Sequence, residues 1–177
     1  MGVAVELYFD EASEQQLRQL QGQLTSQGIP PILEQLGFRP HLSLAGFASS
    51  PPEPIIPLVQ AFAISTQPFT IALSHLGVFP TTEGVVFLAP TLTHHLTRLH
   101  QRFHQQLAHA ALAADRYYQP DQWVPHCTIA TDVAPNQVAT AIHVLLQAFR
   151  PMHVRCIAIG VITYRPARQQ ALFGLGS

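Results

Sequence analysis

The 177-residue sequence contains no lysine, so all nine of its basic residues are arginine. Without lysine, a chain has no side chain for the covalent lysine–nucleotide intermediate of ATP-dependent ligases, for a Schiff base or for a P-loop. These three kinds of chemistry are therefore excluded.

Charged residues of both signs are also few, at 11% of the chain, whereas 47% of the residues are hydrophobic. The net charge is −1 with histidine neutral, so we expect no general electrostatic binding to long nucleic acid. The apolar content favours a compact fold over disorder. This length suits one domain, or two small lobes that share a core.

Only two cysteines are present, Cys127 and Cys156, and each lies in an apolar, strand-like segment. This setting favours buried free thiols in a reducing compartment over a disulfide. No apolar run approaches the roughly 18 residues that span a bilayer, and the N-terminus lacks the pattern of a signal peptide. We therefore expect a cytoplasmic protein without a membrane partner.

Two five-residue segments, Pro40–Leu44 and Pro125–Ile129, share one pattern: proline, histidine, apolar residue, hydroxyl residue, apolar residue. On a β-strand this pattern places the imidazole and the hydroxyl on one face and the apolar side chains on the other. The chain's own composition gives roughly 0.02 chance matches, so two matches are not accidental. A third histidine–x–threonine, His95–Thr97, lacks the proline and lies in a helical pattern, which indicates chance.

The pattern of apolar residues predicts one series of elements in each half. The first half would contain a strand at 3–9, a helix at 11–27, the first motif, a helix at 55–63 and a strand at 69–79. The second half would contain a strand at 84–88, a helix from 91 to about 114, the second motif, a helix beginning after Asp132 or Asn136, and strands at 154–164 and 171–175. The first strand is expected to be half-buried, with Glu6 and Tyr8 on its second face.

Equivalent elements lie 80 to 85 residues apart, which indicates a twofold duplication of a β-α-β-α-β unit. We therefore predict a single bilobal α+β domain over residues 1–177, with repeats of about 1–80 and 81–177. Its sheets would be rich in antiparallel pairs, and the two motifs would face each other across a central cleft.

Two histidines that each have a hydroxyl neighbour suit a metal-free acid–base pair around a tetrahedral anion. One imidazole can accept a proton from water while the other donates a proton to a leaving oxygen. Ser43 and Thr128 would donate hydrogen bonds to phosphate oxygens. Metal binding fits less well because hydroxyls are poor ligands, and a serine nucleophile is disfavoured because no Gly-x-Ser-x-Gly segment is present.

With these motifs the chain resembles the 2H phosphoesterase superfamily, which includes the bacterial 2′-5′ RNA ligases and cyclic nucleotide phosphodiesterases. The resemblance covers most of the chain and also involves residues 5–10 and 123–126. It implies metal-independent hydrolysis or ligation at 2′,3′-cyclic or 2′-5′ phosphates of RNA ends or small nucleotides. His41 and His126 match the catalytic positions, and Ser43 and Thr128 match the phosphate-binding positions. In the second motif, Cys127 replaces the aliphatic residue that is common in the family.

Three further residues are weaker candidates for the site. Arg39 precedes His41 by two residues and could contact phosphate, although a solvated surface arginine is an equal alternative. Tyr8 and Trp123 could stack on a base, although filling the interface between lobes is the more common role of such aromatic residues.

Three other residues have a possible role with less support. Glu6 could orient one catalytic histidine, but no spacing argument links it to either one. His100 and His104 lie four residues apart on a predicted helix and flank its apolar stripe, so we expect surface positions rather than a metal site.

A competing hypothesis is a non-catalytic module that binds a nucleotide or an RNA end. The matched pair of histidines favours the enzyme, because a binding module needs neither an acid nor a base. We expect a monomer that takes a small nucleotide or an RNA terminus, without cofactor, metal or long duplex nucleic acid.

Overall fold

The computed structural model describes residues 2–164 and 166–177, and its elements follow the predicted order in both halves. The strands are β1 (Gly2–Phe9), β2 (His41–Phe47), β3 (Phe69–Val78), β4 (Val86–Pro90), β5 (Cys127–Ala130), β6 (Met152–Tyr164) and β7 (Arg168–Gly174). The helices are α1 (Glu11–Ser26), α2 (Ile32–Gln35), α3 (Ile56–Ile64), α4 (His94–His109) and α5 (Val138–Ala148), with 3-10 turns η1 (Arg116–Tyr118) and η2 (Pro135–Gln137).

Two details of the helices differ from the prediction. The short helix α2 was not predicted, and α4 is shorter than the expected range of 91 to about 114. Helix α4 begins after Thr93, whose hydroxyl caps it by accepting the backbone N–H of Leu96. It ends before Ala111, which adopts a left-handed φ of 55° that no helix continues.

The strands of the described residues form one antiparallel sheet with the order β2-β1-β6-β3-β4-β5, and β7 pairs with β6 outside this path. The order is palindromic, because β1 lies between β2 and β6 just as β4 lies between β5 and β3. A duplicated unit produces this pattern when its halves join through β3 and β6, so the predicted α+β duplication is confirmed. The boundary near residue 80 stays a prediction, and it falls between β3 and β4.

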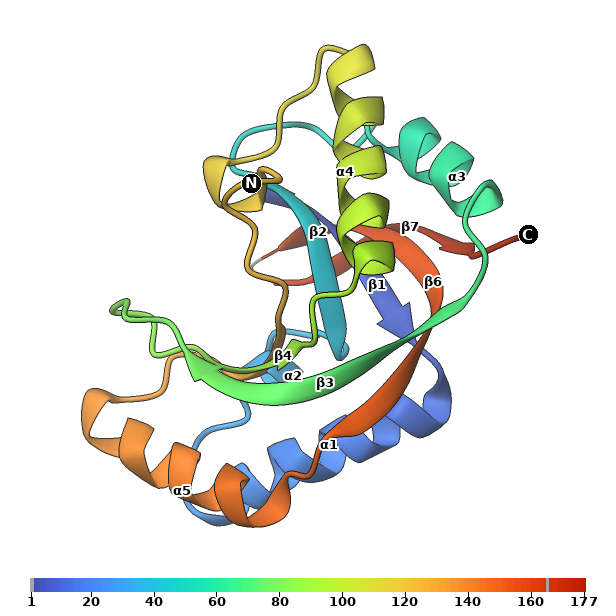
Figure 1. Ribbon diagram of the computed structural model, residues 1–177. Helices are drawn as coiled ribbons and strands as arrows, with labels where there is room; N and C mark the ends of the chain where they lie inside the picture. Colours follow the sequence, from blue (N-terminus) through green and yellow to red (C-terminus); the bar gives the residue numbers. More distant parts are fainter. Residues whose placement is uncertain (1, 165) are drawn as a thin grey trace.

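The helices interlock the two halves. Figure 1 shows α1 and α5 together on one side of the sheet and α3 and α4 together on the other, and helices of each pair contact each other. Each pair takes one helix from each repeat. One cluster of buried apolar side chains runs through both halves, so the lobes share a core.

The sheet curves until its two ends meet. Strands β2 and β5 stand at opposite ends of the strand order, yet they contact each other. Figure 1 shows the long strands β3 and β6 bending through the middle of the molecule. Register shifts interrupt the β1–β2 ladder between Val5 and Glu6 and the β4–β5 ladder between Val86 and Phe87. Such irregularities increase bending and twist, and here they occur at equivalent places in the two halves.

Strand β1 was expected to be half-buried, but every residue in it is buried. Glu6 and Tyr8, on the supposed outer face, are each only 2% exposed. The prediction was wrong because the segment that leads into β2 covers this face with the side chains of Arg39 and His41.

Candidate active site

The two motifs present one core face and one open face, as the alternation predicts. The motif residues that point into the core are Leu42, Leu44, Cys127 and Ile129, and all are at most 3% exposed. Ser43 and Thr128, on the other face, are half-buried. His126 was placed on a strand, but it lies one residue before β5, because the pairing with β4 begins only at Cys127.

Each motif histidine is oriented by the backbone carbonyl two residues before it. Nδ1 of His41 lies 2.7 Å from the carbonyl oxygen of Arg39, and Nδ1 of His126 lies 2.7 Å from that of Val124. A carbonyl only accepts, so Nδ1 carries a hydrogen in both rings and Nε2 is left for chemistry. The residue between is a buried proline in both motifs, and its fixed φ sets the shape of this turn.

The two histidines lie close enough to influence each other electrostatically. Burial lowers the pKa of His126 and the charge of His41 lowers it further, while the hydrogen bond to Val124 acts in the opposite direction. The thiol of Cys127 also lies at the backbone of His41: burial raises the pKa of this thiol to about 12, and the contact opposes that rise. The curvature of the sheet therefore brings the two motifs together.

Aromatic rings surround His126. The ring centroid of Phe79 lies 4.8 Å from that of the imidazole in an edge-on arrangement, and the centroid of Phe87 lies 5.3 Å away. Within residues 2–164 and 166–177, no hydrogen bond or ion pair engages Nε2 of His126. This apolar setting favours the neutral ring, with the Nε2 lone pair available.

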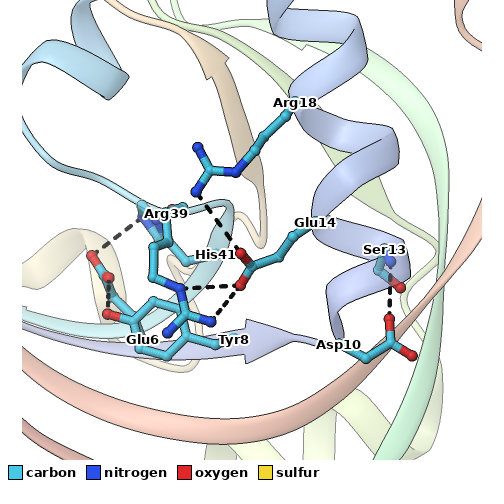
Figure 2. Close-up of polar contacts among 8 residues, drawn as sticks. All are labelled: Glu6, Tyr8, Asp10, Ser13, Glu14, Arg18, Arg39 and His41. Atoms are coloured by element: carbon cyan, nitrogen blue, oxygen red, sulfur yellow. Dashed lines mark hydrogen bonds and ion pairs between the residues drawn. The ribbon is translucent and has the colours of Figure 1, made fainter.

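The surroundings of His41 are polar. Its Nε2 lies 3.3 Å from Oε1 of Glu6, and the Tyr8 hydroxyl donates to Oε2 of the same carboxyl group at 2.8 Å. Figure 2 shows this cluster beside Arg39, whose guanidinium lies 4.5 Å from the centre of the Tyr8 ring. Burial raises the pKa of Glu6, while His41, Tyr8 and Arg39 oppose the rise in that order.

Tyr8 occupies a position other than that of a stacking platform, and Arg39 has a carboxylate partner. Tyr8 is 2% exposed and covered by Arg39, so it offers no platform for a base and that prediction was wrong. Arg39 is partly exposed, but its guanidinium donates to Oε1 of Glu14 on α1 at 2.6 and 3.1 Å. A phosphate at Arg39 would therefore compete with a carboxylate.

Trp123 supports the first motif from outside the sheet. Its indole stacks on His100 with the ring centroids 3.8 Å apart, so one ring face is not available to a base. Its N–H donates to the carbonyl oxygen of Ser43 at 3.0 Å, and Nε2 of His104 lies 3.1 Å from the carbonyl oxygen of Leu44.

The prediction of surface positions for His100 and His104 was wrong. They are 1% and 8% exposed, because Trp123 and β2 cover this side of α4. Burial, and to a smaller extent the neighbouring His104, lowers the pKa of His100 to about 3. The two histidines therefore belong to the packing of α4 against β2.

Three further features of the described residues concern metal ligands, cysteines and membrane spans. The described part of the chain contains no group of three or more histidine, cysteine, aspartate or glutamate side chains that could hold a metal ion. Cys127 and Cys156 are buried free thiols, as expected. Among the described helices, none has the length and apolar character of a membrane span.

Solved structures share this fold. The protein TT0787 of Thermus thermophilus superposes with a TM-score of 0.68 at 18% identity, over 100% of this chain and 99% of that chain. Escherichia coli LigT complexed with NADP+ superposes with a TM-score of 0.61 at 15% identity, over 99% of this chain and 97% of that chain. LigT complexed with 3′-AMP superposes with a TM-score of 0.60 at 16% identity, over 99% of this chain and 98% of that chain.

No curated protein matches the sequence significantly. The sequence model of the 2′-5′ RNA ligase superfamily matches residues 9–168, a range that contains both motifs. The chain therefore belongs to the 2′-5′ RNA ligase superfamily of phosphoesterases and RNA ligases.

Proposed function

We propose that the protein is a metal-independent phosphoesterase that acts on 2′,3′-cyclic or 2′-5′ phosphodiester bonds. One observation carries the proposal: two histidines, each oriented by the carbonyl two residues earlier and each followed by a hydroxyl residue, lie at the meeting ends of one curved sheet. A module that only binds phosphate has no need of two imidazoles with Nε2 left for proton transfer.

The four motif residues have separate roles in an in-line displacement at phosphorus. One histidine accepts a proton from the attacking water, and the other gives a proton to the ester oxygen that leaves. Ser43 and Thr128 donate hydrogen bonds to the non-bridging oxygens, where negative charge grows in the transition state. With an RNA hydroxyl in place of water as the nucleophile, the same groups would join that RNA to a cyclic phosphate, and the 2′- or 3′-oxygen would leave with the proton from the second histidine.

The ligands of solved LigT structures and the net charge of the chain support a substrate class. Solved LigT structures contain 3′-AMP, ATP and NADP+, which are small phosphate-bearing nucleotides. A net charge of −1 gives no broad attraction for duplex nucleic acid. We therefore propose a small nucleotide or an RNA terminus as the substrate of a monomer, and the buried thiols suit the cytoplasm.

A panel of phosphodiesters tests the proposal. The purified protein is incubated with 2′,3′-cyclic nucleotides, 2′-5′ dinucleotides and an RNA with a cyclic phosphate end, with and without chelator, and products are separated by chromatography. We expect turnover of at least one compound that survives chelation. Binding without turnover would instead identify a binding module, and activity lost to chelator and restored by one divalent ion would refute the metal-independent mechanism.

A further inference from the structure

The duplication allows the surroundings of the two histidines to be compared position by position. On β1, Glu6 pairs with Ser43 of β2 on one side and with Gly160 of β6 on the other. On β4, Phe87 pairs with Thr128 of β5 and with Gly77 of β3. Glu6 and Phe87 therefore occupy equivalent positions in the two halves.

This one position differs in chemistry between the halves. Beside His41 the duplication places a carboxyl group, with Oε1 at 3.3 Å from Nε2. Beside His126 it places a phenyl ring, at 5.3 Å between ring centroids. The acid–base pair is thus symmetric in its backbone but not in the groups that face its two imidazoles.

We infer that Glu6 makes the two histidines unequal, so that His41 holds the proton and acts as the general acid while His126, beside Phe87, acts as the general base. The inference rests on the proposed function. Glu6 is a positioning residue in this scheme, because it acts on the substrate only through His41.

Hydrogen-bond accounting supports this assignment. Nδ1 of His41 donates its hydrogen to the carbonyl oxygen of Arg39, and Oε2 of Glu6 accepts a hydrogen bond from the Tyr8 hydroxyl. Nε2 of His41 lies 3.3 Å from Oε1, within ion-pair distance, so a carboxylate at Glu6 favours the protonated form of the ring. The Glu6–His41 pair therefore retains one proton, whereas nothing in the described chain holds a proton on Nε2 of His126.

The other charged and titratable groups around Glu6 and His41 do not change which histidine holds the proton. Arg39 is a neighbouring cation, but its charge is met by Glu14. Tyr8 and Tyr118 lie near Glu6. Burial raises the pKa of both phenols and the charge of Glu6 raises it further, so both remain neutral O–H groups. On strand β6, the residue that pairs with Glu6 is Gly160, which has no side chain.

The resulting step balances in atoms and protons. Water attacks phosphorus and loses a proton to Nε2 of His126, while the bond from phosphorus to the 2′- or 3′-oxygen breaks and that oxygen takes the proton from Nε2 of His41. The Nε2–Oε1 distance of 3.3 Å is longer than an ordinary N–H···O bond, so Glu6 leaves this N–H able to donate to the ester oxygen without a rotation of the ring. Exchange with solvent then restores both rings.

Glu6→Gln tests the inference, because it keeps the shape of the side chain and removes its charge. Removing an opposite charge this close shifts a titration by roughly 1 unit or more. We expect the alkaline limb of the kcat/KM profile to move to lower pH by about that amount and the acidic limb to stay in place. Glu34→Gln, the same change at an exposed position on α2, is the matched control and should move neither limb.

Nitrogen NMR of the histidine rings gives a readout that needs no substrate. With signals assigned through His41→Ala and His126→Ala and spectra recorded over a pH series, the Nε2 signal of His41 should move toward that of an unprotonated ring nitrogen in Glu6→Gln. If the His41 signal and both limbs are unchanged, the inference is wrong although the proposed function stands. If no phosphodiester is turned over, the proposed function fails, and the NMR titration still decides whether Glu6 holds the proton on His41.

Discussion

Ser43 and Thr128 are the single residues that we propose to bind phosphate. They occupy equivalent positions, two residues after the histidines and opposite Glu6 and Phe87 in the sheet. Because each would donate one hydrogen bond to the developing charge, Ser43→Ala or Thr128→Ala should lower kcat/KM by up to about 10²- to 10³-fold.

Exchanging the hydroxyl residues supplies the control for that prediction. Ser43→Thr and Thr128→Ser keep the donor and copy the residue of the other motif, so both should retain most of the activity in steady-state assays. An alanine variant as active as its hydroxyl control would show that the side chain does not touch phosphate.

The repeated proline–histidine pattern could be recognised from sequence alone, because it encodes a local structure: the proline lies between the ring and the carbonyl that orients it. The role of Glu6 could not be predicted in this way. Glu6 meets His41 only through the antiparallel register of β1 and β2, which depends on an irregularity after Val5. Tyr8 was misjudged for the same reason, because Arg39 covers it from the neighbouring segment.

At the scale of elements, α4 positions the first motif without contributing a catalytic group. Trp123 and His104 bond to the backbone of β2 at Ser43 and Leu44, and His100 lies in the same layer. Buried side-chain to backbone hydrogen bonds of this kind contribute about 1 kcal/mol each to stability. The helical spacing of these histidines was visible in the sequence, but the loop that covers them was not.

This layer predicts how stability depends on pH. The pKa of His100 is lowered to about 3 in the folded protein, whereas an unfolded histidine titrates near 6.5. Between these two pKa values the unfolded chain binds a proton at His100 that the folded chain does not bind. The contribution of neutral His100 to the free energy of unfolding is therefore fully present above about pH 6.5 and is lost as the pH falls toward 3. The slope from one such group is at most about 1.4 kcal/mol per pH unit.

Urea unfolding at pH 7 and pH 5 measures this effect. The parent protein should lose more free energy of unfolding over this interval than His100→Phe, which keeps a flat ring against Trp123 but cannot be protonated. Equal losses in the two proteins would mean that His100 does not resist protonation in the fold.

For the whole molecule, the duplication explains both the similarity and the difference of the two motifs. The order of elements and the antiparallel duplication could be predicted, because the periodicity and spacing of apolar residues are local properties. The duplication also predicted that the two motifs face each other, and β2 contacts β5. The closure of one sheet that brings them together was not predicted, because it depends on strand irregularities and on helices shared between the halves. The proposed site exists only because of that closure.

Turnover of a 2′,3′-cyclic nucleotide in the presence of chelator, compared among three histidine variants, tests most directly that the two motifs form one metal-independent acid–base site. His41→Ala and His126→Ala should each lose roughly 10²- to 10⁴-fold, since neither imidazole can replace the other. His95→Ala removes a histidine that also precedes a threonine by two residues, but from the exposed face of α4, and should remain near the parent activity. Parent-like turnover by either motif variant, or an equal loss in His95→Ala, would contradict the account.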